Sequence, residues 1–142
     1  MGPSLSHVQE SVIAPVRWET DRLVLVDQTV LPEREIERDY GTWQEVGAAI
    51  RTLVVRGAPA IGVAAAFGVV LAARASHAAS FDGLLADLET AIKGLAATRP
   101  TAVKLFWALD RMRQAAVASR ALPLDAVRAR LLAEAQAIRD ET

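Results

Sequence analysis

The chain has 142 residues, of which 52% are hydrophobic, so it is long enough to bury the core of one domain. It carries 16 lysine and arginine residues against 17 aspartate and glutamate residues, and the net charge of −1 excludes binding of nucleic acid by a strongly basic face. Cysteine is absent, which excludes disulfides, thiolate metal sites and a cysteine nucleophile among these residues, and His7 and His77 are too few and too far apart for a zinc site.

The first forty residues predict a tail and a small sheet. Residues 1–15 lack the basic start and apolar stretch of a secretory signal, so we expect a flexible tail on a cytoplasmic protein. Short β-type patterns follow at residues 16–18, 23–26 and 33–40, separated by turn residues. We therefore expect a three-stranded antiparallel meander over residues 16–40, in which charged residues guard the last strand as an exposed edge.

Residues 41–142 predict a bundle of five helices, so the fold class is α+β. Thr42 and Glu45 have the spacing of a capping box for a first helix that reaches Val54. Ser80 is a typical N-cap for the third helix. The other three helices are expected to start at prolines, which fit the first helical turn: Pro59, Pro100 and Pro123.

The second of these helices has the most apolar sequence in the chain. Residues 60–73 are all apolar or glycine, but this run is shorter than the roughly 20 residues that cross a membrane. We expect a buried core helix and no membrane association. Gly62 and Gly68 weaken a helix, and we expect them to allow a neighbouring helix to come close.

The remaining helices carry apolar residues at helical spacing, and we expect these residues to face the core. Trp43 is placed in the core on the same grounds. The predicted inward positions of the last three helices are Leu84, Leu85, Leu88, Ile92 and Leu95, then Val103, Phe106, Trp107 and Met112, then Val127, Leu131 and Ile138.

Two arginines precede apolar helices, at positions where a positive charge is unfavourable. A helix N-terminus carries partial positive charge and unpaired N–H groups, so it favours acids. Arg56 stands directly before Gly57 and Ala58, and Arg99 directly before Pro100. We expect the N–H groups of Gly57 and Ala58 to face an anion that both arginines hold with forked charged donors. The alternative is that Arg56 pairs with an acid and Gly57 only permits a turn.

Three stretches resemble one enzyme family. The run Arg56–Ala66, RGAPAIGVAAA, is similar to the signature of the S-methyl-5-thioribose-1-phosphate isomerases. These enzymes belong to the superfamily of the alpha, beta and delta subunits of translation initiation factor 2B. The runs Leu25–Pro32 and Arg99–Leu109 are similar to two further landmarks of the family, so the resemblance extends over residues 16–142.

The resemblance implies an aldose–ketose isomerase of methionine salvage. Its substrate would be S-methyl-5-thioribose 1-phosphate, and no metal or organic cofactor would be needed. The family's substrate contacts fall on Arg56, Gly57, Ala58 and Arg99, the positions that the helix-dipole argument also selects.

The chain departs from the family in two respects. The catalytic cysteine and aspartate of the family lie in a second, Rossmann-like domain, and this sequence has no cysteine and ends at Thr142. We therefore expect an N-terminal domain, over residues 16–142, that is inactive alone, needs the Rossmann-like domain as its partner and forms a homodimer at full length. Lys104 replaces an asparagine of the family, either as a solvated side chain or as an extra phosphate contact.

Other interpretations stay open. The chain could belong to another sugar-phosphate isomerase of the superfamily, to a regulatory sugar-phosphate-binding module of the initiation-factor type, or to a purely structural bundle for oligomer contacts. Asp27 follows a predicted strand and is expected to form a turn. Asp110 is expected to pair with Arg113 or Gln114 on its own helix.

Overall fold

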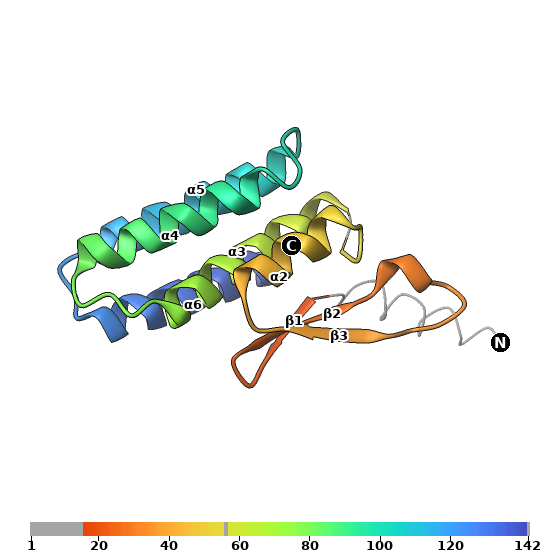
Figure 1. Ribbon diagram of the computed structural model, residues 1–142, viewed down its shortest axis with the longest axis horizontal. Helices are drawn as coiled ribbons and strands as arrows, with labels where there is room; N and C mark the ends of the chain where they lie inside the picture. The colour runs from red at the N-terminus through yellow and green to blue at the C-terminus, as the bar shows by residue number, and fades with distance from the viewer. Residues whose placement is uncertain (1–15, 56, 142) are drawn as a thin grey trace.

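The computed structural model describes residues 16–55 and 57–141, and it confirms the α+β fold: a three-stranded antiparallel sheet is followed by five helices (Figure 1). The predicted tail at residues 1–15 lies outside the described residues. The elements in chain order are β1 (Val16–Glu19), β2 (Arg22–Val26), the 3-10 helix η1 (Gln28–Val30), β3 (Glu37–Tyr40), α2 (Trp43–Arg51), α3 (Ala58–Ala75), α4 (Phe81–Ala96), α5 (Val103–Ala118) and α6 (Leu124–Glu141).

The sheet packs one face against the helices. Strand order is β1-β2-β3, and Leu23 and Leu25 of the central strand are fully buried in the shared core. Trp18 of β1 stacks on Phe67 of α3, with their ring centroids 5.3 Å apart. This contact holds the sheet against the middle of the bundle.

The last strand is shorter than the sequence pattern predicts. It begins at Glu37 instead of residue 33, because the chain first passes through η1 and a turn. The N–H of Asp27 donates to the carbonyl oxygen of Ile36 at 2.7 Å, and the strand pairing starts from there. The charged edge itself is confirmed, since Glu37 and Asp39 are exposed.

Helix α3 lies at the centre of the bundle, as predicted. Every residue from Ile61 to Ala73 is buried, under α2, α4, α5 and α6 and under the first two strands. By length and composition alone the helix Ala58–Ala75 could cross a membrane, but 72% of it is buried inside the protein. Such burial is typical of a core helix in a globular domain.

The two glycines of α3 do allow close packing. A Cβ atom on Gly62 would lie 3.0 Å from the carbonyl oxygen of Lys104 in α5. A Cβ atom on Gly68 would lie 3.0 Å from a methyl carbon of Leu95 in α4. Both distances are tighter than ordinary van der Waals contact. The constraint is stronger at Gly62, because its neighbour is a backbone atom, whereas the Leu95 side chain at Gly68 can shift.

The caps of α2 and α4 are as predicted. Thr42 accepts a hydrogen bond from the N–H of Glu45, whose carboxylate accepts from the N–H of Gly41. Ser80 accepts from the N–H of Gly83. The first helix, however, ends at Arg51 and does not reach Val54, because Leu53 adopts a left-handed conformation with φ of 68°.

Helix α5 faces the core with a different stripe from the predicted one. Met112 is buried as expected, but Val103, Phe106 and Trp107 are exposed by 80%, 46% and 43%. The buried stripe consists of Leu105, Ala108, Leu109, Met112, Ala115 and Ala116. The helix therefore has two apolar faces, and the prediction from apolar periodicity placed the wrong face in the core over the first two turns.

The other predicted core positions are confirmed. Trp43 is half-buried against the core. The predicted inward residues of α4 and α6 are buried, except Leu85, which is half-buried.

Candidate functional site

The starts of α3 and α5 lie at the same end of the bundle. Helix α4 runs back along α3, so α5 is parallel to α3, and Figure 1 shows both helices beginning at the right-hand end. The contact between Gly62 and the backbone of Lys104 joins the second turn of α3 to the first turn of α5. The two helix starts, and with them the positive ends of two helix dipoles, are therefore neighbours.

Neither of these starts has a side-chain cap. The N-cap of α3 is Gly57 and that of α5 is Ala102, and neither helix has an acid in its first turn. Helices α2 and α4 differ, because each has a hydroxyl cap and an acid in the first turn. The first N–H groups of α3 and α5 thus lack the partners that most helices supply from their own sequence.

Gly57 and Ala58 are exposed at the start of α3. Gly57 has φ of 94°, a conformation that favours glycine, and, its chain neighbours aside, no described residue has an atom within 4 Å of the place that a Cβ atom would take. Its carbonyl oxygen accepts from the N–H of Ile61 at 3.0 Å, which begins the helix. The backbone there is open to an approaching ligand.

Arg99 lies in the turn that leads from α4 into α5, on the same side as the start of α3. It is half-buried, and it makes no ion pair with a carboxylate of residues 16–55 or 57–141. Its carbonyl oxygen accepts from the N–H of Ala102 at 3.0 Å, which tightens the turn. Arg99 thus precedes α5 at the end of the bundle where α3 also begins, whereas Arg56 lies outside the described residues.

A buried carboxylate supports the turn before α3. Asp27, 2% exposed, accepts from the N–H and hydroxyl of Thr29 at 2.9 and 2.6 Å and from the guanidinium of Arg38 at 2.6 Å. Burial raises the pKa of Asp27, but the hydrogen bonds from Thr29 and Arg38 outweigh it and hold the pKa below its usual range. The predicted turn at Asp27 is confirmed.

The turn at Asp27 also reaches the candidate site. The N–H of Gln28 donates to the carbonyl oxygen of Val54 at 2.8 Å, two residues before Arg56. This bond ties the end of β2 to the loop between α2 and α3. Sequence reasoning missed the link because it joins residues 26 positions apart with no local pattern.

The other predicted polar residues form surface contacts. Lys104 is exposed, with its ammonium nitrogen 5.1 Å from the ring centroid of Trp107. Asp110 accepts from Gln114 at 2.7 Å and from Arg113 at 3.4 Å, as predicted. Within the described part of the chain, no group of three or more acidic or histidine side chains is placed to hold a metal ion.

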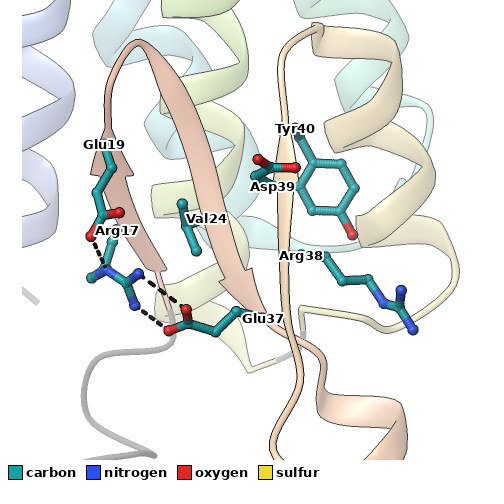
Figure 2. Close-up of a pocket in the computed structure, with 7 residues that line it drawn as sticks. All are labelled: Arg17, Glu19, Val24, Glu37, Arg38, Asp39 and Tyr40. Atoms are coloured by element: carbon teal, nitrogen blue, oxygen red, sulfur yellow. Dashed lines mark hydrogen bonds and ion pairs between the residues drawn. The ribbon is translucent and has the colours of Figure 1, made fainter.

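A hollow lies on the outer face of the sheet, away from the helix starts, with a volume of about 670 Å³. Figure 2 shows Arg17 between Glu19 and Glu37, with hydrogen bonds to both carboxylates. The hydrogen bond from Arg17 lowers the pKa of Glu37. One guanidinium is thus shared by two carboxylates, so this trio carries a net charge of −1 and offers no unpaired cation to an anionic ligand.

The fold and the candidate site thus define a small α+β domain with two adjacent, uncapped helix starts and an arginine beside them. The sequence model of the "Initiation factor 2 subunit family" matches residues 54–142, which is more than half of the chain and contains all four predicted site residues. The chain belongs to this family.

Relatives and solved structures agree with that assignment. The chain is 52% identical over 126 residues to the "Methylthioribose-1-phosphate isomerase" of Syntrophotalea carbinolica, covering 89% of this chain and 37% of the relative. It is 55% identical over 104 residues to the protein of the same name from Thermosynechococcus vestitus, covering 73% of this chain and 29% of the relative. The chain therefore spans about a third of the length of the curated relatives that it matches.

Two solved structures share the fold. The crystal structure of 5-methylthioribose 1-phosphate isomerase from Pyrococcus horikoshii OT3 superposes with a TM-score of 0.85 at 38% identity. The translation initiation factor eIF-2B, subunit delta, from A. fulgidus superposes with a TM-score of 0.83, also at 38% identity. Each comparison covers 89% of this chain and 36% of the solved chain.

Proposed function

We propose that this chain is the phosphate-binding part of an isomerase that converts S-methyl-5-thioribose 1-phosphate to S-methyl-5-thioribulose 1-phosphate. The observation that carries the proposal is the pair of uncapped helix starts at Gly57 and Ala102, with Arg99 in the turn before α5 and no carboxylate of the described residues on its guanidinium. A phosphate would supply the missing acceptor for both helix starts and for the arginine. The substrate in this proposal is the one named in the two isomerase relatives, a methylthioribose 1-phosphate.

In this proposal the chain binds and orients the substrate. Arg56 and Arg99 hold the phosphate with charged, forked donors, and Gly57 and Ala58 donate backbone N–H groups. The phosphate blocks C1, so simple opening to a free aldehyde is not available, and the substrate must be held while its ring opens and a hydrogen moves from C2 to C1. Because the reaction is an internal rearrangement, no external oxidant or reductant is consumed.

The proton transfers are assigned to a second, Rossmann-like domain. This chain has no cysteine, and it covers only 37% of the relative from Syntrophotalea carbinolica, so most of that enzyme lies outside the matched region. We propose that the complete enzyme is a cytoplasmic homodimer and that the 142-residue chain alone turns over no substrate.

A hybrid enzyme tests the proposal, with residues 16–142 of this chain in place of the matched region of the 52% identical relative. We expect isomerase activity from the hybrid enzyme and none from the 142-residue chain.

Arg56→Ala in the hybrid should raise KM by about tenfold or more, because a charged hydrogen bond contributes about 1.5–3 kcal/mol. Arg51→Ala is the matched control, since Arg51 is exposed at the end of α2. Unchanged KM and kcat in Arg56→Ala would refute the site.

The superposition on the initiation factor subunit favours a second candidate, a sugar-phosphate sensor without catalysis. Such a module would bind the sugar phosphate when joined to its second domain but would never convert it. Calorimetric binding together with a turnover assay on the hybrid enzyme separates the two functions. A failure of any sugar phosphate to bind would instead favour a structural bundle.

A further inference from the structure

We infer that the outward face of α5, formed by Val103, Phe106 and Trp107, is the docking surface for the catalytic domain of the complete enzyme. This inference rests on the proposed function, because it takes the domain that the longer relatives carry as the partner. We call these three residues the α5 outer face.

The α5 outer face is apolar and open. Val103, Phe106 and Trp107 stand at positions i, i+3 and i+4, which share one side of a helix. Their exposed fractions are 80%, 46% and 43%, and they are three of the six large hydrophobic residues found exposed among those described. Clustered exposure of large apolar side chains is typical of an interaction site, whereas scattered single residues need no explanation.

The end of α6 identifies the partner. Arg111 donates to both carboxylate oxygens of Glu141, at 2.7 Å each, and its guanidinium carbon lies 5.5 Å from the centroid of the Trp107 ring. The last described residue of α6 is therefore one side chain away from the α5 outer face. A polypeptide that continues from α6, as in the longer relatives, starts beside this surface and can fold onto it without a long linker.

The charges around the face argue against a second copy of this chain as the occupant. Lys104 and Arg111 lie against the Trp107 ring at this face, and Lys104 pairs with no carboxylate within residues 16–55 and 57–141. A symmetric contact through the same face would bring these cations toward their own copies, which is unfavourable. An apolar surface with an acidic rim, supplied by a different domain, complements them.

The position of the face also gives docking a role. Val103 is the first residue of α5, so a domain seated there covers the start of α5 and the neighbouring start of α3. Water would then be excluded from the bound phosphate, which strengthens its interactions with the helix starts and with Arg99. The same contact would bring catalytic groups of the second domain to the substrate.

Hydroxyl-radical footprinting tests the contact without reference to activity. In the hybrid enzyme we expect Phe106 and Trp107 to be oxidised several-fold more slowly than in the 142-residue chain. Val117 and Leu122, exposed by 41% and 47% beyond the middle of α5, are internal controls and should be labelled equally in both proteins. Equal labelling of Phe106 and Trp107 in both proteins would overturn the inference.

A pair of double variants gives a second measurement. Val103→Gln with Phe106→Gln should lower the unfolding temperature of the hybrid enzyme by about 3 °C or more, because buried apolar contacts are lost. Val117→Gln with Leu122→Gln is the matched control and should leave it nearly unchanged. In the 142-residue chain both double variants should have small and similar effects, because all four side chains are already exposed.

The outcomes separate this inference from the proposed function. A hybrid enzyme that protects the α5 outer face but neither binds nor converts the sugar phosphate would refute the function and keep the docking surface. A loss of stability that is equal in both proteins would refute the docking surface. Self-association of the 142-residue chain that the Val103 and Phe106 changes abolish would assign the face to a second copy and overturn the inference.

Discussion

Gly62 of α3 lies so close to Lys104 of α5 that a Cβ atom on the glycine would be 3.0 Å from the lysine carbonyl oxygen. The neighbouring atom belongs to the backbone, so it cannot rotate away as the end of a flexible side chain can. This contact sets the spacing between the second turn of α3 and the first turn of α5. The candidate site depends on that spacing, because its donors come from both helices.

Gly62→Ala should therefore destabilise the domain. Alanine is favoured over glycine in a helix by about 1 kcal/mol, but forcing α5 away costs about 1–3 kcal/mol, so we expect a net loss in the free energy of unfolding. Gly47→Ala in α2 is the control, since a Cβ atom there meets its nearest neighbour at 3.4 Å. Urea unfolding of both variants should show opposite signs, and a stabilised Gly62→Ala would contradict the role given to this contact.

Asp27→Asn should lower stability in a manner that depends on pH. The pKa of Asp27 is held below its unfolded value, so the ionised carboxylate stabilises the fold above that unfolded pKa, and the contribution is lost as pH falls through the folded pKa. At pH 7 we expect the substitution to cost about 1–3 kcal/mol, because a buried charged hydrogen bond to Arg38 is lost.

Unfolding measured at pH 7 and near pH 3 checks this expectation. The difference between the native protein and Asp27→Asn should shrink in acid. Asp39→Asn is the control, because Asp39 is 61% exposed and its ion pair with Arg22 lies on the surface of the same sheet. A difference that is constant across this pH range would show that the charge of Asp27 has no part in stability.

Local signals in the sequence predicted the starts of α2, α3 and α4 correctly, whereas α5 begins at Val103 and not at the predicted Pro100, which lies in the preceding turn. Thr42 and Ser80 cap their helices because a hydroxyl needs only the N–H groups two or three residues further along. Gly57 and Pro59 likewise favour the start of α3, because glycine tolerates the positive φ of the N-cap and proline fits the first helical turn. Features of this kind are contained within a few residues, so they can be read without knowing the tertiary structure.

Features that depend on distant residues could not be predicted. The first turns of α5 carry two apolar faces, and only the positions of α3 and α6 decide that Leu105 is buried while Phe106 is exposed. Leu53 adopts a left-handed conformation directly before Val54, whose carbonyl oxygen accepts a hydrogen bond from the N–H of Gln28, 26 residues earlier. The four residues of the candidate site stay a prediction from the sequence, and the structure adds that the starts of α3 and α5 are adjacent.

Arg128→Met should weaken the other end of α3. The guanidinium of Arg128 donates to the carbonyl oxygens of Ala73 and Ser76 at 2.8 and 3.1 Å, where the helix dipole favours a cation. We expect a loss of about 1–3 kcal/mol in the free energy of unfolding, and a smaller loss for Arg128→Lys, which has no fork. Arg130→Met, two residues further along and 46% exposed, should cost less than about 1 kcal/mol. Equal losses in the free energy of unfolding for Arg128→Met and Arg130→Met would contradict the capping role given to Arg128.

Arg99→Gln should weaken phosphate binding without unfolding the domain. Arg99 has no carboxylate partner among the described residues, so its loss leaves no buried acid uncompensated, and the unfolding temperature of the 142-residue chain should change little. In the hybrid enzyme the affinity for the sugar phosphate should fall by about tenfold or more, since a charged hydrogen bond is worth about 1.5–3 kcal/mol. Arg120→Gln is the control, because Arg120 is 60% exposed at the opposite end of α5. Calorimetric titration of both variants decides the point: if Arg99→Gln binds as tightly as Arg120→Gln, the anion does not lie between the two helix starts.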